Sequence, residues 1–261
     1  MKFDLESQAT SKYIDELNLQ FESFPLFCEG ESKVVRELGN NLVLIRMKPT
    51  LFSYKANRYA IVEGTEQYRL EISRILWQCL AKAGVTVSIK GVGKHSYVSE
   101  KVTPVPVEVV VKACHVGTPK HIYKKMESYQ TRFGQYICPG DTHEPYVRFD
   151  WRNPLPERDE CLPIWIANQY IDIKVAEQTA LKSFHVLRQF LSPRKIHLQD
   201  ICFFITQDGK EIYGEVSPDC MRVKYEGDDL DKDVFRQGKS ADEVLNKYRK
   251  FLELIQLPTI N

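Results

Sequence analysis

Residues 103–112 read TPVPVEVVVK, and this stretch does most to decide the fold. Its two prolines, at positions 104 and 106, fix the backbone and exclude a helix, while the valine-rich run after them is typical of a strand. We therefore place an internal boundary here. It predicts an N-terminal domain over residues 1–103 and a C-terminal domain over residues 104–261.

The strand that begins here has two different faces. Side chains alternate along it, so Glu108, Val110 and Lys112 share one face and the odd-numbered valines share the other. Charged groups on an otherwise apolar strand need partners or a ligand when they are buried. This face therefore indicates the wall of a polar pocket, and the competing interpretation is a mutual Glu108–Lys112 pair at a sheet edge.

The flanking sequence predicts strands mainly before the boundary and mixed elements after it. Residues 1–28 read as an arm laid on the body. Before the boundary we expect a hairpin over 33–38 and 41–46 around Gly39-Asn40, a helix over 68–83 capped by Thr65 and ended by Gly84, and a strand over 85–89. After it we expect an irregular region over 115–170 and a helix over 176–191 that ends before Pro193. The last expected elements are a hairpin over 201–205 and 211–213 around Asp208-Gly209 and a helix opened by the capping box Ser240–Glu243. This order predicts an α+β, two-lobed fold, with a β-rich N-terminal lobe and a larger mixed C-terminal lobe around a cleft.

Composition excludes several classes of protein. Thirty-six Lys and Arg against 35 Asp and Glu give a net charge of +1, which disfavours a nucleic-acid or anionic-membrane binder. The seven cysteines include no C-x-x-C pair, and no run approaches the ~18 apolar residues that span a bilayer. The first residues lack the features of a secretory signal, so we expect a cytoplasmic protein with reduced thiols.

Two charged segments could carry chemistry. A glycine turn at 29–33 places Lys33 where an ammonium could reach nucleotide phosphates, although the spacing is not that of a Walker loop. Residues 214–222 and 231–236 gather carboxylates, which can hold Mg²⁺, with Arg222 and Arg236, whose planar forks suit phosphate or carboxylate. A solvated turn and a charged surface loop are the competing interpretations. Histidine-metal, serine-hydrolase and protein-kinase motifs are absent from the sequence.

Six segments together resemble SAICAR synthetase, and they occur in the same order as in that family. They lie at residues 30–35, 80–85, 105–112, 117–118, 217–222 and 230–236. The resemblance implies a nucleotide-binding N-terminal lobe joined by a hinge to a larger C-terminal lobe. It also implies an enzyme that uses ATP and Mg²⁺ to convert a carboxylate into an acyl phosphate, which an amine then attacks.

The resemblance assigns roles to individual positions. The implied nucleotide contacts are Gly30, Lys33 and Glu108, and the implied catalytic residues are Glu108, Asp219 and Lys232. The implied contacts to an anionic substrate are Lys112, Thr118, Arg152, Arg222 and Arg236. Lys112 stands where the family has Arg, and Thr118 stands where it has Ser. Glu215 and Asp200 are the implied metal carboxylates.

Departures from the family pattern fall on the same segments. Glu31 replaces one of two lysines in the glycine turn, and residues 51–57 replace the family's substrate loop. Trp151-Arg152-Asn153-Pro154 stands near the place of a His-Asp-Pro element. The strand at 200–204 keeps its Asp but has lost a Glu that would be a magnesium ligand, and only Gly214-Glu215 remains of a Gly-Asp-Glu element.

Three functions stay open on this sequence. The first is a divergent ATP-dependent ligase that joins an amine to an anionic carboxylate, with a ribose phosphate as a candidate substrate, in specialised metabolism. The second is the purine-pathway reaction itself. The third is a non-ligating relative that keeps an anion pocket without ATP chemistry, which Glu31, Cys202 and Phe204 favour. The sequence leaves the oligomeric state open, a homo-oligomer included.

Overall fold

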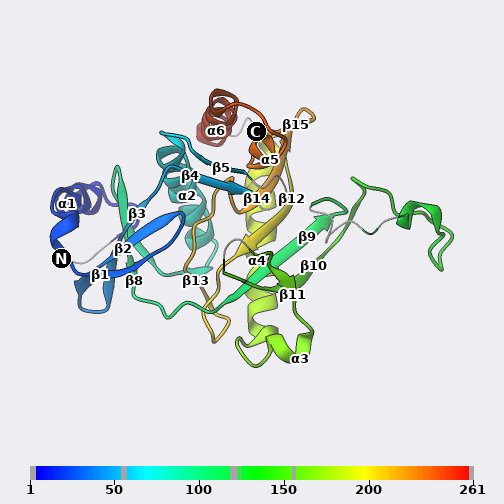
Figure 1. Ribbon diagram of the computed structural model, residues 1–261, viewed down its shortest axis with the longest axis horizontal. Coiled ribbons are helices and arrows are strands. Elements are labelled where there is room, and N and C mark those ends of the chain that lie inside the picture. The colour runs from blue at the N-terminus through cyan, green and yellow to red at the C-terminus, as the bar shows by residue number, and fades with distance from the viewer. Residues whose placement is uncertain (1–3, 54–57, 118–122, 124, 155–156, 259–261) are drawn as a thin grey trace.

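The computed structural model describes residues 4–53, 58–117, 123, 125–154 and 157–258, and these form an α+β fold (Figure 1). Most strands belong to two antiparallel sheets, one on each side of the predicted boundary. Three helices pack together beside them, and a long segment that includes residues 125–141 extends away from the body (Figure 1).

The N-terminal sheet has five antiparallel strands. In spatial order they are β1 (Leu26–Glu29), β2 (Lys33–Gly39), β3 (Leu42–Met47), β8 (Ser96–Glu100) and β7 (Ile89–Val92). The predicted hairpin is confirmed, because β2 and β3 pair around a turn in which Gly39, Asn40 and Asn41 all have positive φ, as Gly and Asn tolerate. The expected N-terminal arm contains a helix, α1 (Gln8–Leu19), whose Ile14 packs on this sheet with Leu44 and Val98.

The C-terminal sheet has six antiparallel strands. In spatial order they are β11 (Glu160–Cys161), β10 (Thr142–Trp151), β9 (Val107–Cys114), β12 (Ile196–Phe203), β14 (Met221–Tyr225) and β15 (Asp228–Asp229). The strand after the double proline is therefore central, which rules out the sheet-edge interpretation of Glu108 and Lys112. The expectation of an irregular region over 115–170 was wrong in part, because β10 pairs with β9 along most of its length and α3 (Ile164–Ala167) follows.

Two small sheets complete the strands. β4 (Thr50–Ser53) pairs antiparallel with β5 (Arg58–Ile61), and β6 (Thr86–Val87) pairs parallel with β13 (Glu211–Ile212). The predicted strand over 85–89 is thus divided between β6 and β7. The turn at Asp208-Gly209 is present, with Gly209 at φ +76°, and its two arms are joined by an isolated bridge from Ile205 to Ile212 in place of the longer predicted ladder.

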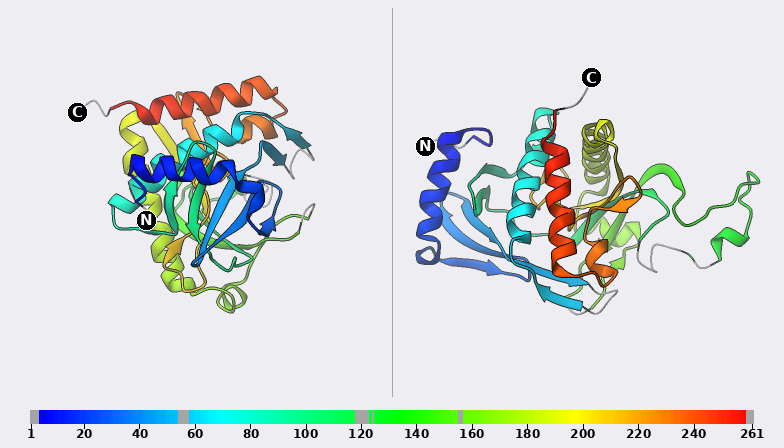
Figure 2. Two further views of the ribbon diagram at one scale, coloured as in Figure 1. Left: turned by 90° about the vertical axis from the view of Figure 1, so that its left-hand side faces the viewer. Right: turned by 90° about the horizontal axis from the view of Figure 1, so that it is seen from above.

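Three long helices cover the sheets, and Figure 2 shows α2 and α6 side by side. They are α2 (Thr65–Lys82), α4 (Ile173–Leu191) and α6 (Ala241–Gln256). Besides the helices already given, the described chain has α5 (Asp233–Arg236) and the 3-10 turns η1 (Phe21–Ser23), η2 (Met126–Ser128) and η3 (Ser192–Arg194). The capping box of Ser240 and Glu243 is confirmed. The predicted cap of α2 was wrong, because its N-cap is Gly64 and the Thr65 hydroxyl donates instead to the Val62 carbonyl at 2.7 Å.

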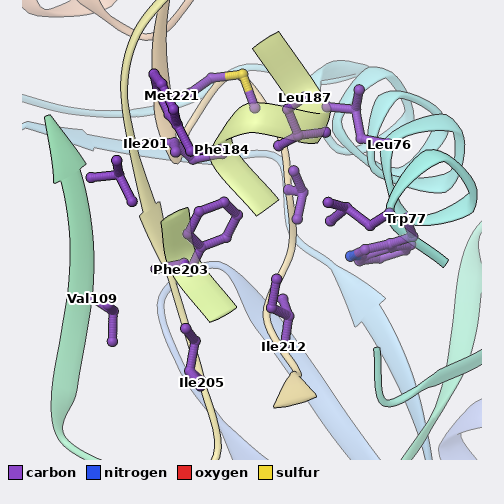
Figure 3. Close-up of a cluster of buried hydrophobic side chains, with 14 of the residues drawn as sticks. Leu76, Trp77, Val109, Phe184, Leu187, Ile201, Phe203, Ile205, Ile212 and Met221 are labelled. Atoms are coloured by element: carbon purple, nitrogen blue, oxygen red, sulfur yellow. The ribbon is translucent and has the colours of Figure 1, made fainter. Parts of the chain in front are cut away.

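One hydrophobic core joins the two sheets. Leu76 and Trp77 of α2 meet Phe184 and Leu187 of α4, with Phe203 of β12 beside them (Figure 3). Because this core crosses the boundary at 103/104, the two domains share their interior, and their division stays a prediction. No helix in the described part of the chain combines the length and the hydropathy of a membrane span.

Candidate functional site

A cavity of about 390 Å³ lies where the two sheets meet, and charged side chains from both form much of its wall. Lys33 comes from β2, Arg69 from α2, and the others from the C-terminal sheet and the segments that follow its strands. Nine of the predicted site residues line it: Lys33, Glu108, Arg152, Asp200, Glu215, Asp219, Arg222, Lys232 and Arg236. The sequence therefore predicted most of a site whose members are far apart in the chain.

Glu215 lies at the centre of one charge cluster. Arg69 binds it with two hydrogen bonds, from Nε to Oε1 at 3.1 Å and from Nη2 to Oε2 at 2.8 Å. Lys33 Nζ lies 2.5 Å from Oε2, and the Ser217 hydroxyl donates to Oε1 at 2.6 Å. Burial alone would raise the pKa of Glu215, but Arg69 and Lys33 hold it well below its usual range. Both oxygens of this buried carboxylate are thus occupied by donors.

Asp219 extends the same cluster. The Tyr248 hydroxyl donates to its Oδ1, while Lys232 Nζ lies 3.4 Å and Arg69 Nε 3.6 Å from its Oδ2. Burial favours the neutral acid, yet Arg69 and Lys232 lower the pKa of Asp219. The contact with Lys232 is long, so this ammonium is less tightly bound than Lys33.

A second cluster surrounds Asp200, which lies opposite both Lys112 and Arg222 across neighbouring strands. Lys112 Nζ donates to its Oδ2 at 2.6 Å, and Arg222 Nη1 donates to the same oxygen at 2.8 Å. Arg222 Nε also donates to Asp233 Oδ2 at 3.0 Å, and Asp233 in turn binds Arg236. The cluster therefore holds two guanidinium groups at one end of the cavity.

The buried carboxylate of Asp231 sets the backbone of this end. It accepts hydrogen bonds from the backbone N–H of Val223 and of Asp233, each at 2.7 Å. Burial and the nearby charge of Asp233 raise the pKa of Asp231 to about 8. These bonds tie the start of α5 to β14, which places Lys232 and Arg236 beside Arg222.

A third group lies on the β9 side of the cavity. Arg152 Nε is 3.3 Å from Glu108 Oε1, and its Cζ lies 4.7 Å from the centroid of the Phe204 ring. Cys202 is half-buried beside Glu108, and desolvation followed by that carboxylate raises the pKa of the thiol well above its usual value.

Three predicted residues do not line the described cavity wall. Gly30 forms the turn before β2, where its N–H donates to the Lys33 carbonyl at 2.9 Å. Lys112 is 1% exposed, and its ammonium is bound by Asp200 and by the Val116 carbonyl at 2.6 Å, so its direct contact with a substrate stays a prediction. Thr118 lies outside the described residues.

Sequence reasoning missed Arg69, Arg148 and Asp150. Arg69 lies on the buried side of α2 with Ile72, so a charge within that helix's apolar stripe was the available signal. Arg148 and Asp150 form a paired contact on β10, with two distances of 2.7 Å, in the region expected to be irregular.

The two carboxylates predicted to hold a metal, Glu215 and Asp200, are both engaged by cations of the chain. Glu215 has donors on both oxygens, and Asp200 already binds Lys112 and Arg222. In the described ranges there is no group of three or more His, Cys, Asp or Glu placed to hold a metal. Mg²⁺ needs oxygen ligands in near-octahedral geometry, so an ion ligated by Glu215 or Asp200 would compete with these ion pairs.

The described cavity wall combines eight cationic and seven carboxylate side chains, and its cations offer donors to the anionic groups of a ligand. Its cations are fixed by carboxylates behind them, and Arg152, Arg222, Lys232 and Arg236 also face the same space. Guanidinium groups held in this way bind phosphate or carboxylate oxygens with defined geometry and little loss of side-chain entropy.

Comparisons with known proteins agree with this geometry. The sequence profile described as SAICAR synthetase matches residues 26–253. Phosphoribosylaminoimidazole-succinocarboxamide synthase of Methanocaldococcus jannaschii is 28% identical over 89% of this chain and 95% of that protein. Bifunctional cordycepin biosynthesis cluster protein 3 of Cordyceps militaris is 25% identical over 87% of this chain, which spans only 32% of that relative. A solved structure, "SAICAR synthetase (Type-2) in complex with ADP", has a TM-score of 0.73 and 25% identity, covering 90% of this chain and 99% of its own.

Proposed function

Because the chain belongs to the SAICAR synthetase family, we propose that it is an ATP-dependent ligase that joins a carboxylate to an amine. The γ-phosphoryl group of ATP passes to a carboxylate oxygen, which gives an acyl phosphate and ADP. The amine nitrogen then attacks the acyl carbon, phosphate leaves with the C–O bond electrons, and the nitrogen loses a proton. Phosphate is a far better leaving group than hydroxide, and this is why ATP is needed.

One observation carries this proposal: a single cavity brings Lys33 of the N-terminal sheet together with Glu108, Arg222 and Lys232 of the C-terminal part. A ligase of this kind must place a nucleotide and an anionic acceptor side by side, because catalysis rests on positioning and on neutralising charge. The ADP complex of the related structure supports a nucleotide as one ligand.

The cavity divides naturally into two ends. In this proposal the glycine turn of Gly30 with Lys33 and Glu108 forms the nucleotide end. Arg222 and Arg236 form the acceptor end, together with Arg152 and Thr118, while Lys112 supports them through Asp200.

The proposed catalytic groups are Glu108, Asp219 and Lys232. Lys232 is the group best placed to neutralise charge on the transferred phosphoryl, since its ammonium lies 3.4 Å from Asp219, whereas the ammonium of Lys33 lies 2.5 Å from Glu215. Magnesium enters with the phosphates of ATP, since the two predicted metal carboxylates are already bound by cations of the chain.

The acceptor that we propose is an anionic carboxylate, with a ribose phosphate as the first candidate, and the co-substrate is an amine. The Cordyceps relative bears a name from cordycepin biosynthesis, which supports a nucleoside-like product of specialised metabolism. The purine-pathway reaction is the alternative substrate assignment, supported by the 95% coverage of the Methanocaldococcus enzyme.

A thermal-shift titration with ATP and ADP, followed by an assay of ADP release with ribose-phosphate carboxylates and amines, tests the ligase. We expect nucleotide to raise Tm, Lys33→Ala to abolish that rise, and Lys101→Ala, on an exposed part of the same sheet, to leave it unchanged. Rescue of a purine auxotroph would identify the housekeeping reaction. A chain that responds to no nucleotide would refute the ligase.

A binding protein without ATP chemistry is the second candidate, because Glu215 already occupies Lys33, the expected phosphate contact. That function predicts no response to nucleotide. It predicts instead a rise in Tm with ribose 5-phosphate that Arg222→Ala removes.

A further inference from the structure

Phe204 lines the cavity and packs directly on Gly214. A Cβ added at Gly214 would lie 2.4 Å from Phe204 Cδ2, 2.9 Å from its Cβ and 3.0 Å from its Cγ. The Tyr213 N–H also donates to the Phe204 carbonyl at 3.0 Å. The ring therefore occupies the space beside the backbone of Gly214, and any side chain there would displace it.

Arg152 lies over this ring, with its Cζ 4.7 Å from the centroid. Its side chain is 51% exposed, and its charged contact within the described chain is the 3.3 Å approach of Nε to Glu108. A guanidinium over an aromatic face keeps its N–H donors free in its own plane. Arg152 is thus a half-exposed cation that lies over the Phe204 ring at the cavity wall.

The other arginines paired across the cavity differ from Arg152. Arg69 and Arg222 are 1% and 11% exposed, and each holds a carboxylate within 2.8 Å. They are bound tightly to the protein's own anions. Arg152 has a longer ion-pair contact, an exposed side chain and the Phe204 ring beneath its guanidinium. This is the arrangement expected of a group that binds a ligand.

We propose that the guanidinium of Arg152, seated on Phe204, binds an oxyanion of the ligand directly. It thereby supplies the positive charge that a divalent cation held by protein carboxylates would otherwise supply. This inference rests on the proposed function. The oxyanion belongs either to the nucleotide's phosphates or to the acceptor, and both are phosphate or carboxylate oxygens.

Ligand affinity with and without divalent cations tests the proposal. ADP and ribose 5-phosphate are titrated by calorimetry into the wild-type chain in excess EDTA and in Mg²⁺. We expect at least one of the two to bind in EDTA with a Kd within about threefold of its value in Mg²⁺. Arg152→Ala should raise that Kd in EDTA by about tenfold or more, because a charge-assisted hydrogen bond is lost. The ligand that loses affinity identifies the source of the oxyanion.

Matched variants separate this role from simple charge. Arg158→Ala removes another arginine of the cavity wall, one for which the described residues give no cation–π contact, and Arg132→Ala removes a cation over Phe133 outside the cavity. Neither should change the Kd in EDTA as Arg152→Ala does. Phe204→Leu keeps the guanidinium but removes its seat, so an intermediate loss is expected, with folding verified by circular dichroism.

The outcomes distinguish this proposal from the function on which it rests. Binding that EDTA abolishes, an equal loss in Arg158→Ala, or a stoichiometric Mn²⁺ site in the wild-type chain without nucleotide overturns the Arg152 proposal alone. A chain that binds neither ADP nor ribose 5-phosphate under any condition overturns the proposed function, and the Arg152 proposal with it.

Discussion

Replacing Arg69 by Met tests the charge cluster that joins α2 to the cavity. Arg69 is fully buried and makes three hydrogen bonds, two to Glu215 and one from Nη1 to the Lys48 carbonyl at 3.1 Å. Met has a similar length but no charge, so Glu215 would keep only Lys33 and Ser217. Removing one partner of a buried ion pair costs about 3–5 kcal/mol. At about 2–4 °C per kcal/mol for a chain of this size, Tm should fall by about 6–20 °C.

The double variant Arg69→Met/Glu215→Leu is the matched control. It removes both charges, and replacing a whole buried pair by apolar groups is often nearly neutral, so we expect most of the lost stability to return. Urea unfolding followed by far-UV circular dichroism gives the free energies, with equal m values as the check on two-state behaviour. A loss below about 1 kcal/mol in the single variant, or a double variant as unstable as the single one, would refute this account of the cluster.

Three further predictions concern stability. In the folded chain the pKa of Glu215 lies below its ordinary value of 4.5, so its contribution to stability is present above pH 4.5 and is lost as the pH falls. As the pH is lowered, the Tm of the wild type should therefore fall more steeply than the Tm of Glu215→Gln. Gly214→Ala should cost about 1–3 kcal/mol by overpacking against Phe204, and Phe204→Leu in the same chain should restore part of it in a urea titration. Ser240→Ala should cost about 0.5–2 kcal/mol, because Glu243 loses its capping partner, and an unchanged melting curve would contradict that.

Local sequence signals predicted the parts of the fold that depend on them. The family, the α+β fold and the first hairpin are confirmed, as is the helix that Ser240 opens. In each of these elements a turn or cap is specified by residues next to it. The apolar spacing agreed with these signals, so pattern and boundary supported each other.

Signals failed where pairing partners are distant. β10 contains Pro145 and several charged residues, so its own pattern is not that of a strand, and its pairing with β9 comes from the tertiary fold. Thr65 satisfies the usual preference for an N-cap, but Gly64, at φ +94°, takes that position. Single-segment patterns do not contain this information.

The site shows the same division. Motif positions predicted which residues gather at the cavity, but not what each of them contacts. Lys112 lies on the face of β9 that the alternation of the strand predicts, but its ammonium donates a hydrogen bond to Asp200 on the neighbouring strand. That pairing depends on the register between β9 and β12, which the sequence of either strand does not reveal.

The indole of Trp77 gives the molecule an optical reporter for its cavity. Trp77 is fully buried, and its Nε1 donates to the Gly214 carbonyl at 3.1 Å. Phe204 packs on this same glycine. Of the other two tryptophans, Trp165 is 75% exposed and Trp151 is half-buried, so Trp77 emits from the least polar environment of the three. A ligand that shifts Phe204 would alter the blue edge of the intrinsic emission spectrum, and occupancy could be followed by fluorescence without any label.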